Sequence, residues 1–181
     1  LLMNLLLTMR KLSRDKSSVL WRRMDPSEQD SNFELKDSSD RGVGIFTKLS
    51  YSKDEVVMRG IVHEVVRVNH VGVSQMGENE YFEPIGFMAL VNHSCNPNCG
   101  IRLNETGAQD YVAIRDIKKG EEVTFDYAMQ NYKIGYFPSR CLCGASDCRG
   151  TIGGWVDLPT QKRQQYEGYV APYLLELDLR K

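Results

Sequence analysis

The chain has 181 residues, of which 41% are hydrophobic and 26% charged, and its formal net charge is −1. This length suits one domain with short appendages, and the composition is that of a globular protein. A near-neutral charge gives no overall attraction to nucleic acid, and no apolar run in the sequence approaches the roughly 20 residues that span a bilayer. We therefore expect neither direct nucleic-acid binding nor membrane insertion.

The first residues, LLMNLLLTMRKLSR, place an apolar stretch before a basic one. A secretory signal has the opposite order and ends at a cleavage site with small residues. We expect residues 1–32 to form a short helix and a linker. The protein is expected to be an intracellular monomer, nuclear or cytoplasmic, and an organellar targeting role for this N-terminus stays open.

Most of the chain after residue 32 predicts short strands. Phe33 and Leu35 stand at strand spacing, and RGVGIFTKL predicts a tight glycine turn that leads into a strand. Further segments are short, rich in valine and bounded by Gly, Asp or Asn, which is typical of strands. These segments are DEVVMRG (54–60), IVHEVVRV (61–68), HVGVSQM (70–76) and YVAIRDI (111–117). KKGEEVTFDY (118–127) predicts a charged turn and a final strand.

Only two parts of the sequence have helical character. One is GFMALVN (86–92), and the other is the C-terminal tail. Apolar residues of the tail recur at steps of three and four, as in an amphipathic helix, namely Tyr166, Tyr169, Val170, Tyr173, Leu174 and Leu177. Pro172 is expected to divide this helix. The body is therefore predicted to be mostly β.

Three cysteines form the pattern C-x-C-x4-C in CLCGASDC (141–148). Two cysteines one residue apart do not easily form a disulfide with each other, but both can bind one metal ion. Closed tetrahedral zinc needs a fourth ligand, for which Cys95, Cys99 or a histidine is available. Four thiolates leave no open position, so such a zinc ion would be structural. Disulfides are the alternative, although five cysteines are an odd number and no secretion signal supports an oxidising compartment.

The stretch VNHSCNPNC (91–99) combines asparagines, a histidine and two cysteines. His93 and Cys95 are two residues apart, so on an extended segment they face the same way and can form a nucleophilic pair. No third group that would orient the histidine is evident. The Pro and Asn content favours a rigid irregular loop, because Asn side chains readily bond backbone groups.

Four stretches, RGVGIF (41–46), VNHSCNPNC (91–99), GEEVTFDY (120–127) and CLCGASDCRGTIGG (141–154), stand in an order and at a spacing that resemble a SET domain with its post-SET zinc segment. The chain is similar to SET-domain protein-lysine methyltransferases over residues 33–153. The resemblance implies the SET fold, with short curved sheets around a knot-like core. It divides the chain into a SET domain (33–128), a post-SET zinc segment (137–153) and a C-terminal helical tail (154–181).

The resemblance also implies S-adenosylmethionine-dependent methylation of an exposed lysine in a histone or another protein. Tyr127 matches the catalytic tyrosine, and Phe125 lines the substrate channel, where it leaves room that favours di- or trimethylation. One structural zinc ion is implied, with the ligands Cys95, Cys141, Cys143 and Cys148, which leaves Cys99 as a small buried hydrophobe. Contacts to the methyl donor are implied for Arg41, Gly42, Val43, Gly44, His70, Asn92, His93, Tyr127 and Leu142.

The chain departs from the family pattern in two places. Ala89, Leu90 and Val91 stand where Arg-Phe-Ile is common, and the insert between Gly60 and Asn92 is short. Within this insert Tyr81 is the alternative to His70 as a cofactor contact. Trp155 is expected either to cover the cofactor or to anchor the zinc segment. The alternative functions are an inactive SET-like protein-interaction module and a zinc-stabilised interaction domain that binds no cofactor.

Overall fold

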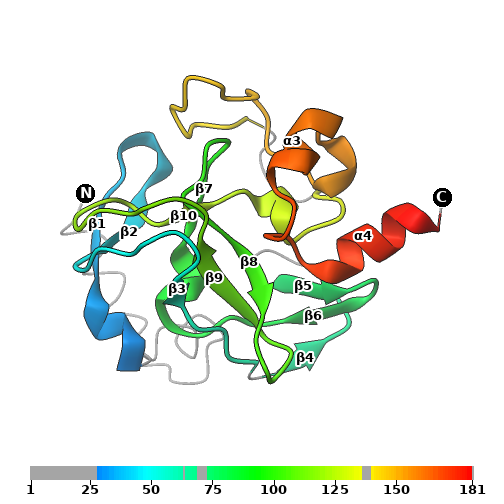
Figure 1. The fold of residues 1–181 in the computed structure, drawn as a ribbon, viewed down its shortest axis with the longest axis horizontal. Helices are drawn as coiled ribbons and strands as arrows, with labels where there is room; N and C mark the ends of the chain where they lie inside the picture. The colour runs from blue at the N-terminus through cyan, green and yellow to red at the C-terminus, as the bar shows by residue number, and fades with distance from the viewer. Residues whose placement is uncertain (1–27, 63, 69–72, 136–139, 181) are drawn as a thin grey trace.

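The computed structural model describes residues 28–62, 64–68, 73–135 and 140–180 (Figure 1). Most of the helix and linker expected in residues 1–32 lies outside the described residues, and so does His70. Among the helices that the structure describes, none has the length and apolar character to cross a membrane.

Three small sheets make up the body, which confirms the mostly β prediction (Figure 1). The first pairs β1 (Phe33–Asp37) with β2 (Val43–Thr47) in antiparallel fashion. The second has the strand order β3 (Val56–Met58), β9 (Gln109–Ala113), β8 (Cys99–Leu103), β10 (Thr124–Phe125) and β7 (Asn92–His93). The third has the order β4 (Val65–Val66), β6 (Glu80–Phe82) and β5 (Ser74–Gly77).

The short strand β10 brings two distant motifs together. It runs parallel to β7, where Phe125 pairs with His93, and also parallel to β8, where Phe125 pairs with Cys99. The irregular loop between β7 and β8 is fixed by Asn98, whose amide donates to the carbonyl of Glu122 and accepts from the N–H of Thr124. As the sequence predicts, an asparagine side chain replaces ladder bonds in this loop. Residues 91–99 therefore lie against residues 122–127.

The helices are short. Within the described residues the 3-10 helices are η1 (Glu28–Asn32), η2 (Ser39–Arg41), η3 (Gly86–Leu90), η4 (Tyr127–Met129) and η5 (Trp155–Asp157). The α-helices in the same part of the chain are α3 (Thr160–Gln165) and α4 (Pro172–Leu179). The prediction of helix from residue 166 is therefore right for α4 and wrong for residues 166–171. Pro172 begins α4, because its missing N–H costs nothing in the first turn of a helix.

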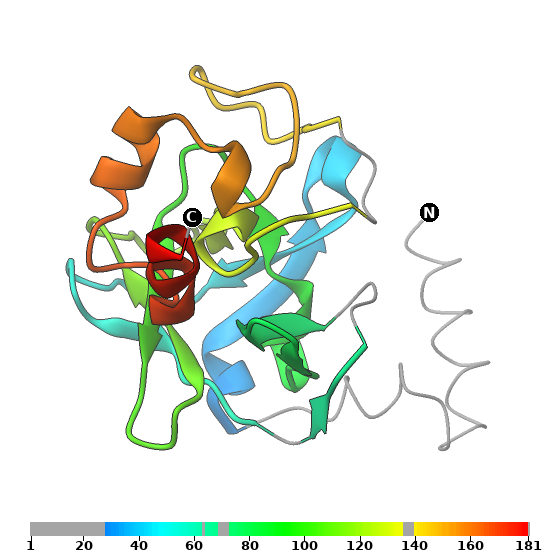
Figure 2. The same ribbon diagram turned by 90° about the vertical axis from the view of Figure 1, so that its right-hand side faces the viewer.

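The C-terminal tail packs against the sheets and does not stand apart from them, as Figure 2 shows with α4 towards the viewer. The N–H of Ile101 donates to the carbonyl of Tyr169 at 2.8 Å. At Gly100 a Cβ atom would stand 2.5 Å from the Tyr169 side chain, so only glycine allows this approach. Leu174 of α4 is fully buried. The tail thus completes the hydrophobic core of the domain.

Candidate functional site

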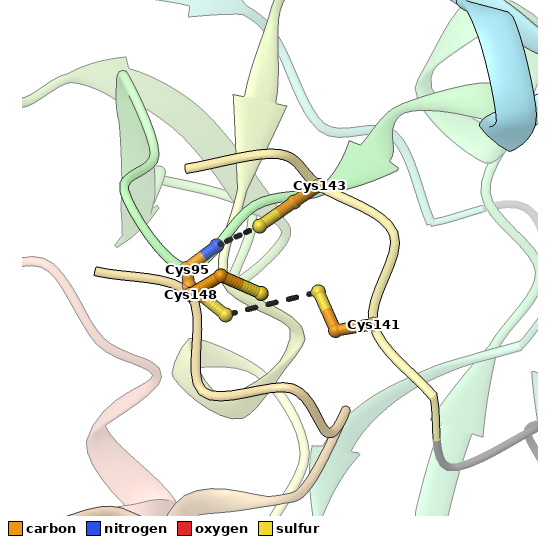
Figure 3. Close-up of side chains that lie close together, drawn as sticks. All are labelled: Cys95, Cys141, Cys143 and Cys148. Carbon is orange, nitrogen blue, oxygen red and sulfur yellow. Dashed lines mark hydrogen bonds between the residues drawn. The ribbon is translucent and has the colours of Figure 1, made fainter. Parts of the chain in front are cut away.

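Four cysteine sulfurs come together at one point, three from the loop after residue 140 and one from the loop after β7 (Figure 3). The sulfurs of Cys95, Cys141, Cys143 and Cys148 lie within 4.8 Å of one another. Those of Cys95 and Cys141 are 3.8 Å apart. A tetrahedral zinc ion at about 2.3 Å from each sulfur holds the sulfurs about 3.8 Å apart. The donor set therefore fits one closed zinc site, and Cys99 lies outside it, fully buried.

Backbone N–H groups point at these sulfurs. Cys95 N–H donates to the sulfur of Cys143 at 3.5 Å (Figure 3). Arg149 N–H donates to the sulfur of Cys95 at 3.4 Å. Burial opposes ionisation of Cys143, but backbone N–H groups lower the pKa of its thiol to about 7. Burial raises the pKa of the Cys141 thiol to about 11. A bound metal would keep all four ionised, and the N–H groups would share the resulting charge.

His93 is buried beside this cluster and is not open to a ligand. Its Nε2 lies 3.5 Å from the sulfur of Cys95, and its Nδ1 accepts the backbone N–H of Tyr127 at 3.2 Å. Burial lowers the pKa of His93 to about 4, although Asp126 opposes the shift. The contact between His93 and Cys95 that the spacing predicts is present. Burial also raises the pKa of Cys95, which argues against a nucleophilic pair.

Asp126, just before Tyr127, is the centre of a buried network. Its side chain is fully buried. It accepts a hydrogen bond from the N–H of Ala128 and thereby caps η4. Arg149 forms an ion pair with it, at 2.7 Å from Nη1 to Oδ2 and 2.9 Å from Nη2 to Oδ1. The hydroxyl of Tyr166 donates to Oδ2 at 2.9 Å. The zinc segment and the tail are thereby tied to the residue next to Tyr127.

The contacts with Asp126 shift the pKa values of its partners Tyr166 and Arg149. Burial raises the pKa of the Tyr166 hydroxyl, and the neighbouring carboxylate of Asp126 raises it further. Burial alone would lower the pKa of Arg149, but the hydrogen-bonded Asp126 raises it above its ordinary value. Arg149 therefore stays charged and Tyr166 stays protonated as a donor.

The glycine turn before β2 is held by Glu122. The carboxylate of Glu122 accepts from Arg41 at 2.5 Å and from the amide of Asn92 at 2.9 Å. Asn92 also donates to the carbonyl of Val43 at 3.0 Å. The structure thus brings Arg41, Val43 and Asn92 together as the sequence predicts, around a carboxylate that sequence reasoning missed.

The two glycines of this turn are needed for different reasons. Gly42 has φ +80°, a conformation that side chains disfavour, and a Cβ atom there would meet nothing within 4 Å. At Gly44 a Cβ atom would stand 2.4 Å from the carboxylate of Glu122. The turn therefore leaves open space at Gly42, as a backbone that receives a ligand requires, and packs tightly at Gly44.

Tyr127 lies at a small cavity of about 70 Å³ that is also lined by Phe125, Tyr111 and Val91. The Tyr127 hydroxyl donates to the carbonyl of Val91 at 3.1 Å. The ring of Phe125 lies 4.7 Å from that of Tyr111 and 5.0 Å from that of Tyr127. The structure therefore places Phe125 and Tyr127 in one aromatic wall of this cavity.

Three further residues are placed by the structure. Leu142, between two of the cysteines, is 43% exposed and is thus accessible to a ligand. Trp155 is 3% exposed and donates from its ring N–H to Asp178 of α4 at 2.7 Å, so it anchors the tail and does not cover a cofactor. Tyr81 is buried in β6.

Sequence reasoning missed several residues of this site, namely Glu122, Arg149, Tyr166, Tyr111 and Asn131. Glu122 stands inside the motif GEEVTFDY and Arg149 directly after a zinc ligand, so their positions offered a signal. Tyr166 was taken only as an apolar helix position, and nothing in the local sequence distinguishes Tyr111 or Asn131.

The model of the SET-domain family matches residues 42–128. The "Histone-lysine N-methyltransferase, H3 lysine-36 specific" of Mycosarcoma maydis is 35% identical over 98 residues, which are 51% of this chain and 10% of that protein. The histone-lysine N-methyltransferase Set2 of Drosophila melanogaster is 30% identical over 138 residues, which are 65% of this chain and 6% of that protein. The chain thus spans a tenth or less of the length of these two curated relatives.

Solved structures share the fold. A chain from "Structural basis for the product specificity of histone lysine methyltransferases" aligns with a TM-score of 0.52 and 23% identity, over 66% of this chain and 55% of that chain. Kryptonite in complex with mCHH DNA, an H3(1–15) peptide and SAH aligns with a TM-score of 0.51 and 22% identity, over 67% of this chain and 29% of that chain. Residues 42–128 are thus similar to the SET-domain family and the solved structures share the fold, and the four cysteine sulfurs and the β7–β10 pairing accompany this match.

Proposed function

We propose that this chain is the catalytic part of an S-adenosylmethionine-dependent protein-lysine N-methyltransferase. The division into a SET domain (33–128), a post-SET zinc segment (137–153) and a helical tail (154–181) is part of this proposal. So are the roles of the site residues, with Tyr127 as the catalytic tyrosine and Phe125 in the lysine channel.

The observation that carries the proposal is the position of Tyr127. Its side chain lines the small aromatic cavity, and its hydroxyl bonds the carbonyl of Val91. Val91 is followed directly by Asn92, whose amide holds the carbonyl of Val43 in the glycine turn. Tyr127 therefore joins the cavity, which suits a lysine side chain, to the turn that is expected to receive the methyl donor.

S-adenosylmethionine supplies a methyl group activated on a sulfonium. A lysine amine has a pKa near 10.4 and must lose its proton before it can attack. The aromatic wall of Phe125, Tyr111 and Tyr127 excludes water and directs the amine along one line, and such positioning can supply much of a rate enhancement. The Val91 carbonyl accepts the hydrogen bond that the Tyr127 hydroxyl donates, and this bond fixes the position of the hydroxyl at the cavity.

The residues present fit both S-adenosylmethionine and a zinc ion. Open space at Gly42 suits the methionine end of the donor, and exposed Leu142 suits its adenine. The side chains of Asn92 and His93 are turned inward to Val43, Glu122 and Tyr127, so we propose that these two residues shape the donor site mainly through their backbone. The four cysteines suit one structural zinc ion, which would hold the post-SET segment against the domain.

The names of the relatives favour histone H3 as the protein substrate. Both the Mycosarcoma maydis enzyme and an enzyme of Saccharomyces cerevisiae carry H3 lysines in their names, lysine-36 and lysine-4 respectively. We therefore propose a lysine of an H3 tail as the methyl acceptor, and a place of action with chromatin.

The test begins with calorimetric titration of the zinc-loaded protein with S-adenosylmethionine. Binding in the micromolar range is expected for the wild type and for Tyr127→Phe, and much weaker binding for Asn92→Ala, which loses the bonds to Val43 and Glu122. Methyl transfer to recombinant histone H3 is then followed by mass spectrometry. Tyr127→Phe should lower the rate at least about a hundredfold, the range of a positioned catalytic side chain.

Two results would contradict the proposal. A well-folded, zinc-bound wild type that binds no S-adenosylmethionine would point to a zinc-stabilised interaction domain. A wild type that binds the donor but transfers no methyl group to histones or to a library of lysine peptides would point to an inactive SET-like module.

A further inference from the structure

Asn131, which follows η4, is anchored at three of its four polar groups. Its side-chain Nδ2 and its backbone N–H both donate to the carbonyl of Tyr127 at 3.0 Å. Its backbone carbonyl accepts the N–H of Trp155 at 2.8 Å. The fourth group, the amide oxygen Oδ1, is buried, and no donor in the described part of the chain bonds it.

The amide orientation is determined by these contacts. Exchanging Oδ1 and Nδ2 would bring two oxygens, that of the side chain and that of Tyr127, to hydrogen-bond distance without a proton between them. The unpaired group is therefore an acceptor and not a donor.

An unpaired buried acceptor is unusual, because nearly all buried polar atoms in native proteins find a partner. The neighbouring Gln130 follows the rule. It is 3% exposed against 6% for Asn131, and its amide bonds the side chain of Gln109. Both residues line the cavity that Phe125 and Tyr127 also line. Asn131, whose side-chain oxygen is unpaired, is therefore one of the residues that line the cavity to which the proposed function assigns the lysine.

We propose that Oδ1 of Asn131 accepts a hydrogen bond from an N–H of the substrate amine, which makes Asn131 a residue that determines the degree of methylation. The inference rests on the proposed function, which assigns this cavity to the lysine. A carbonyl oxygen selects for N–H and against N–CH₃, because a methyl group in the same place leaves the acceptor unpaired and the cavity crowded.

The chemistry of successive transfers gives the expected limit. In each transfer the nitrogen lone pair forms the new N–CH₃ bond, the S–CH₃ bond breaks with its electron pair on sulfur, and a proton leaves the nitrogen. A neutral lysine amine offers two N–H groups to Oδ1, monomethyl-lysine offers one, and dimethyl-lysine offers none. The enzyme should therefore stop at the dimethyl product, which narrows the expectation of di- or trimethylation drawn from Phe125.

The first experiment measures amine binding without methyl transfer. Butylammonium and N,N,N-trimethylbutylammonium are titrated into zinc-loaded protein saturated with S-adenosylhomocysteine, and the side-chain amide of Asn131 is followed by NMR. The wild type should bind butylammonium about tenfold more tightly, since a hydrogen bond to a charged group is worth at least one factor of ten. The ratio should fall below about twofold in Asn131→Leu and persist in Asn131→Asp, which keeps an oxygen in place.

The second experiment compares rates on histone H3 peptides that carry unmethylated, monomethyl or dimethyl-lysine. The wild type should use the first two at least about tenfold faster than the third, and Asn131→Leu should reduce this difference. Asn104→Ala is the matched control. Asn104 lies in the β8–β9 loop, and the substitution removes the bonds of a half-buried amide to Gly60 and Asp110, so it should slow all three substrates alike.

The outcomes separate this inference from the proposed function. If butylammonium binds with the expected preference but no methyl group is transferred, the methyltransferase function fails, and of the role of Asn131 only the hydrogen bond to an amine stands. If methyl transfer occurs without a preference among the three peptides, or if neither amine binds, the role of Asn131 is wrong. Loss of the preference in Asn104→Ala would also overturn it.

Discussion

The two sides of the segment 124–131 are both buried, but they differ in whether their buried polar side chains have hydrogen-bond partners. On the zinc side, Asp126 is fully enclosed and is bonded by Ala128, Arg149 and Tyr166. On the cavity side, Asn131 is nearly as buried, yet its amide oxygen has no donor among the described residues.

This difference separates stability from binding. A buried charge costs several kcal/mol unless it is paired, so the complete network around Asp126 protects the stability of the domain. An unpaired buried acceptor lowers stability, by about 1–3 kcal/mol, and can regain this free energy by bonding a ligand. Changes on the zinc side should therefore lower stability, and changes on the cavity side should alter binding and selectivity.

The largest effect should come from the zinc centre. Structural zinc contributes on the order of 10 kcal/mol in small zinc-dependent peptides, and loss of one thiolate opens the site. Cys95→Ser, or treatment with a strong chelator, should lower the melting temperature sharply in differential scanning calorimetry. Elemental analysis should find one zinc per wild-type chain and per Cys99→Ala chain, because Cys99 lies outside the cluster. Retention of zinc by Cys95→Ser with unchanged melting would contradict the site.

Asp126→Ala should have the next largest effect. It leaves the guanidinium of Arg149 without its partner in a mostly buried position, and removing one partner of a buried ion pair costs about 3–5 kcal/mol. Urea unfolding measures this loss. Asp54→Ala is the control, because Asp54 also pairs with an arginine and a tyrosine hydroxyl but at the surface. Equal losses in the two variants would show that burial does not distinguish the two networks.

Tyr166→Phe should have a smaller effect on the same side. It removes one donor to Asp126 but leaves the ion pair with Arg149, so about 1–2 kcal/mol of unfolding free energy should be lost. If the change leaves urea unfolding and zinc content as in the wild type, the tail does not stabilise the zinc side through this bond.

Asn131→Leu should change stability least. The lost bond from Nδ2 to Tyr127 is offset by removal of a buried unpaired oxygen, so the unfolding free energy should shift by less than about 1 kcal/mol in either direction. A loss comparable to that of Asp126→Ala would show that Asn131 belongs to the stabilising side of the segment and would erase the contrast.

Much of the site could be predicted because its residues lie in short motifs. The pattern C-x-C-x4-C limits what three thiols can do, and the zinc prediction agrees with the geometry of all four sulfurs. The strand predictions agree with the structure where segments rich in valine meet turn residues, as in β3 and β9. The strand β8, with the sequence CGIRL, was not predicted because it contains a glycine and one β-branched residue, although it pairs with β9 across a short loop.

The sequence by itself determined the resemblance to the SET domain, the cluster of three cysteines and the position of Tyr127 in its motif, because each of these depends on residue types at fixed local spacing. Only the tertiary structure decided which other side chains hold these residues in place. Tyr166 reaches Asp126 across 40 residues and Arg149 across 23, and neither contact is encoded by a local pattern. The free oxygen of Asn131 is likewise a property of the packed cavity, because whether a polar atom has a partner depends on every chain segment that surrounds it.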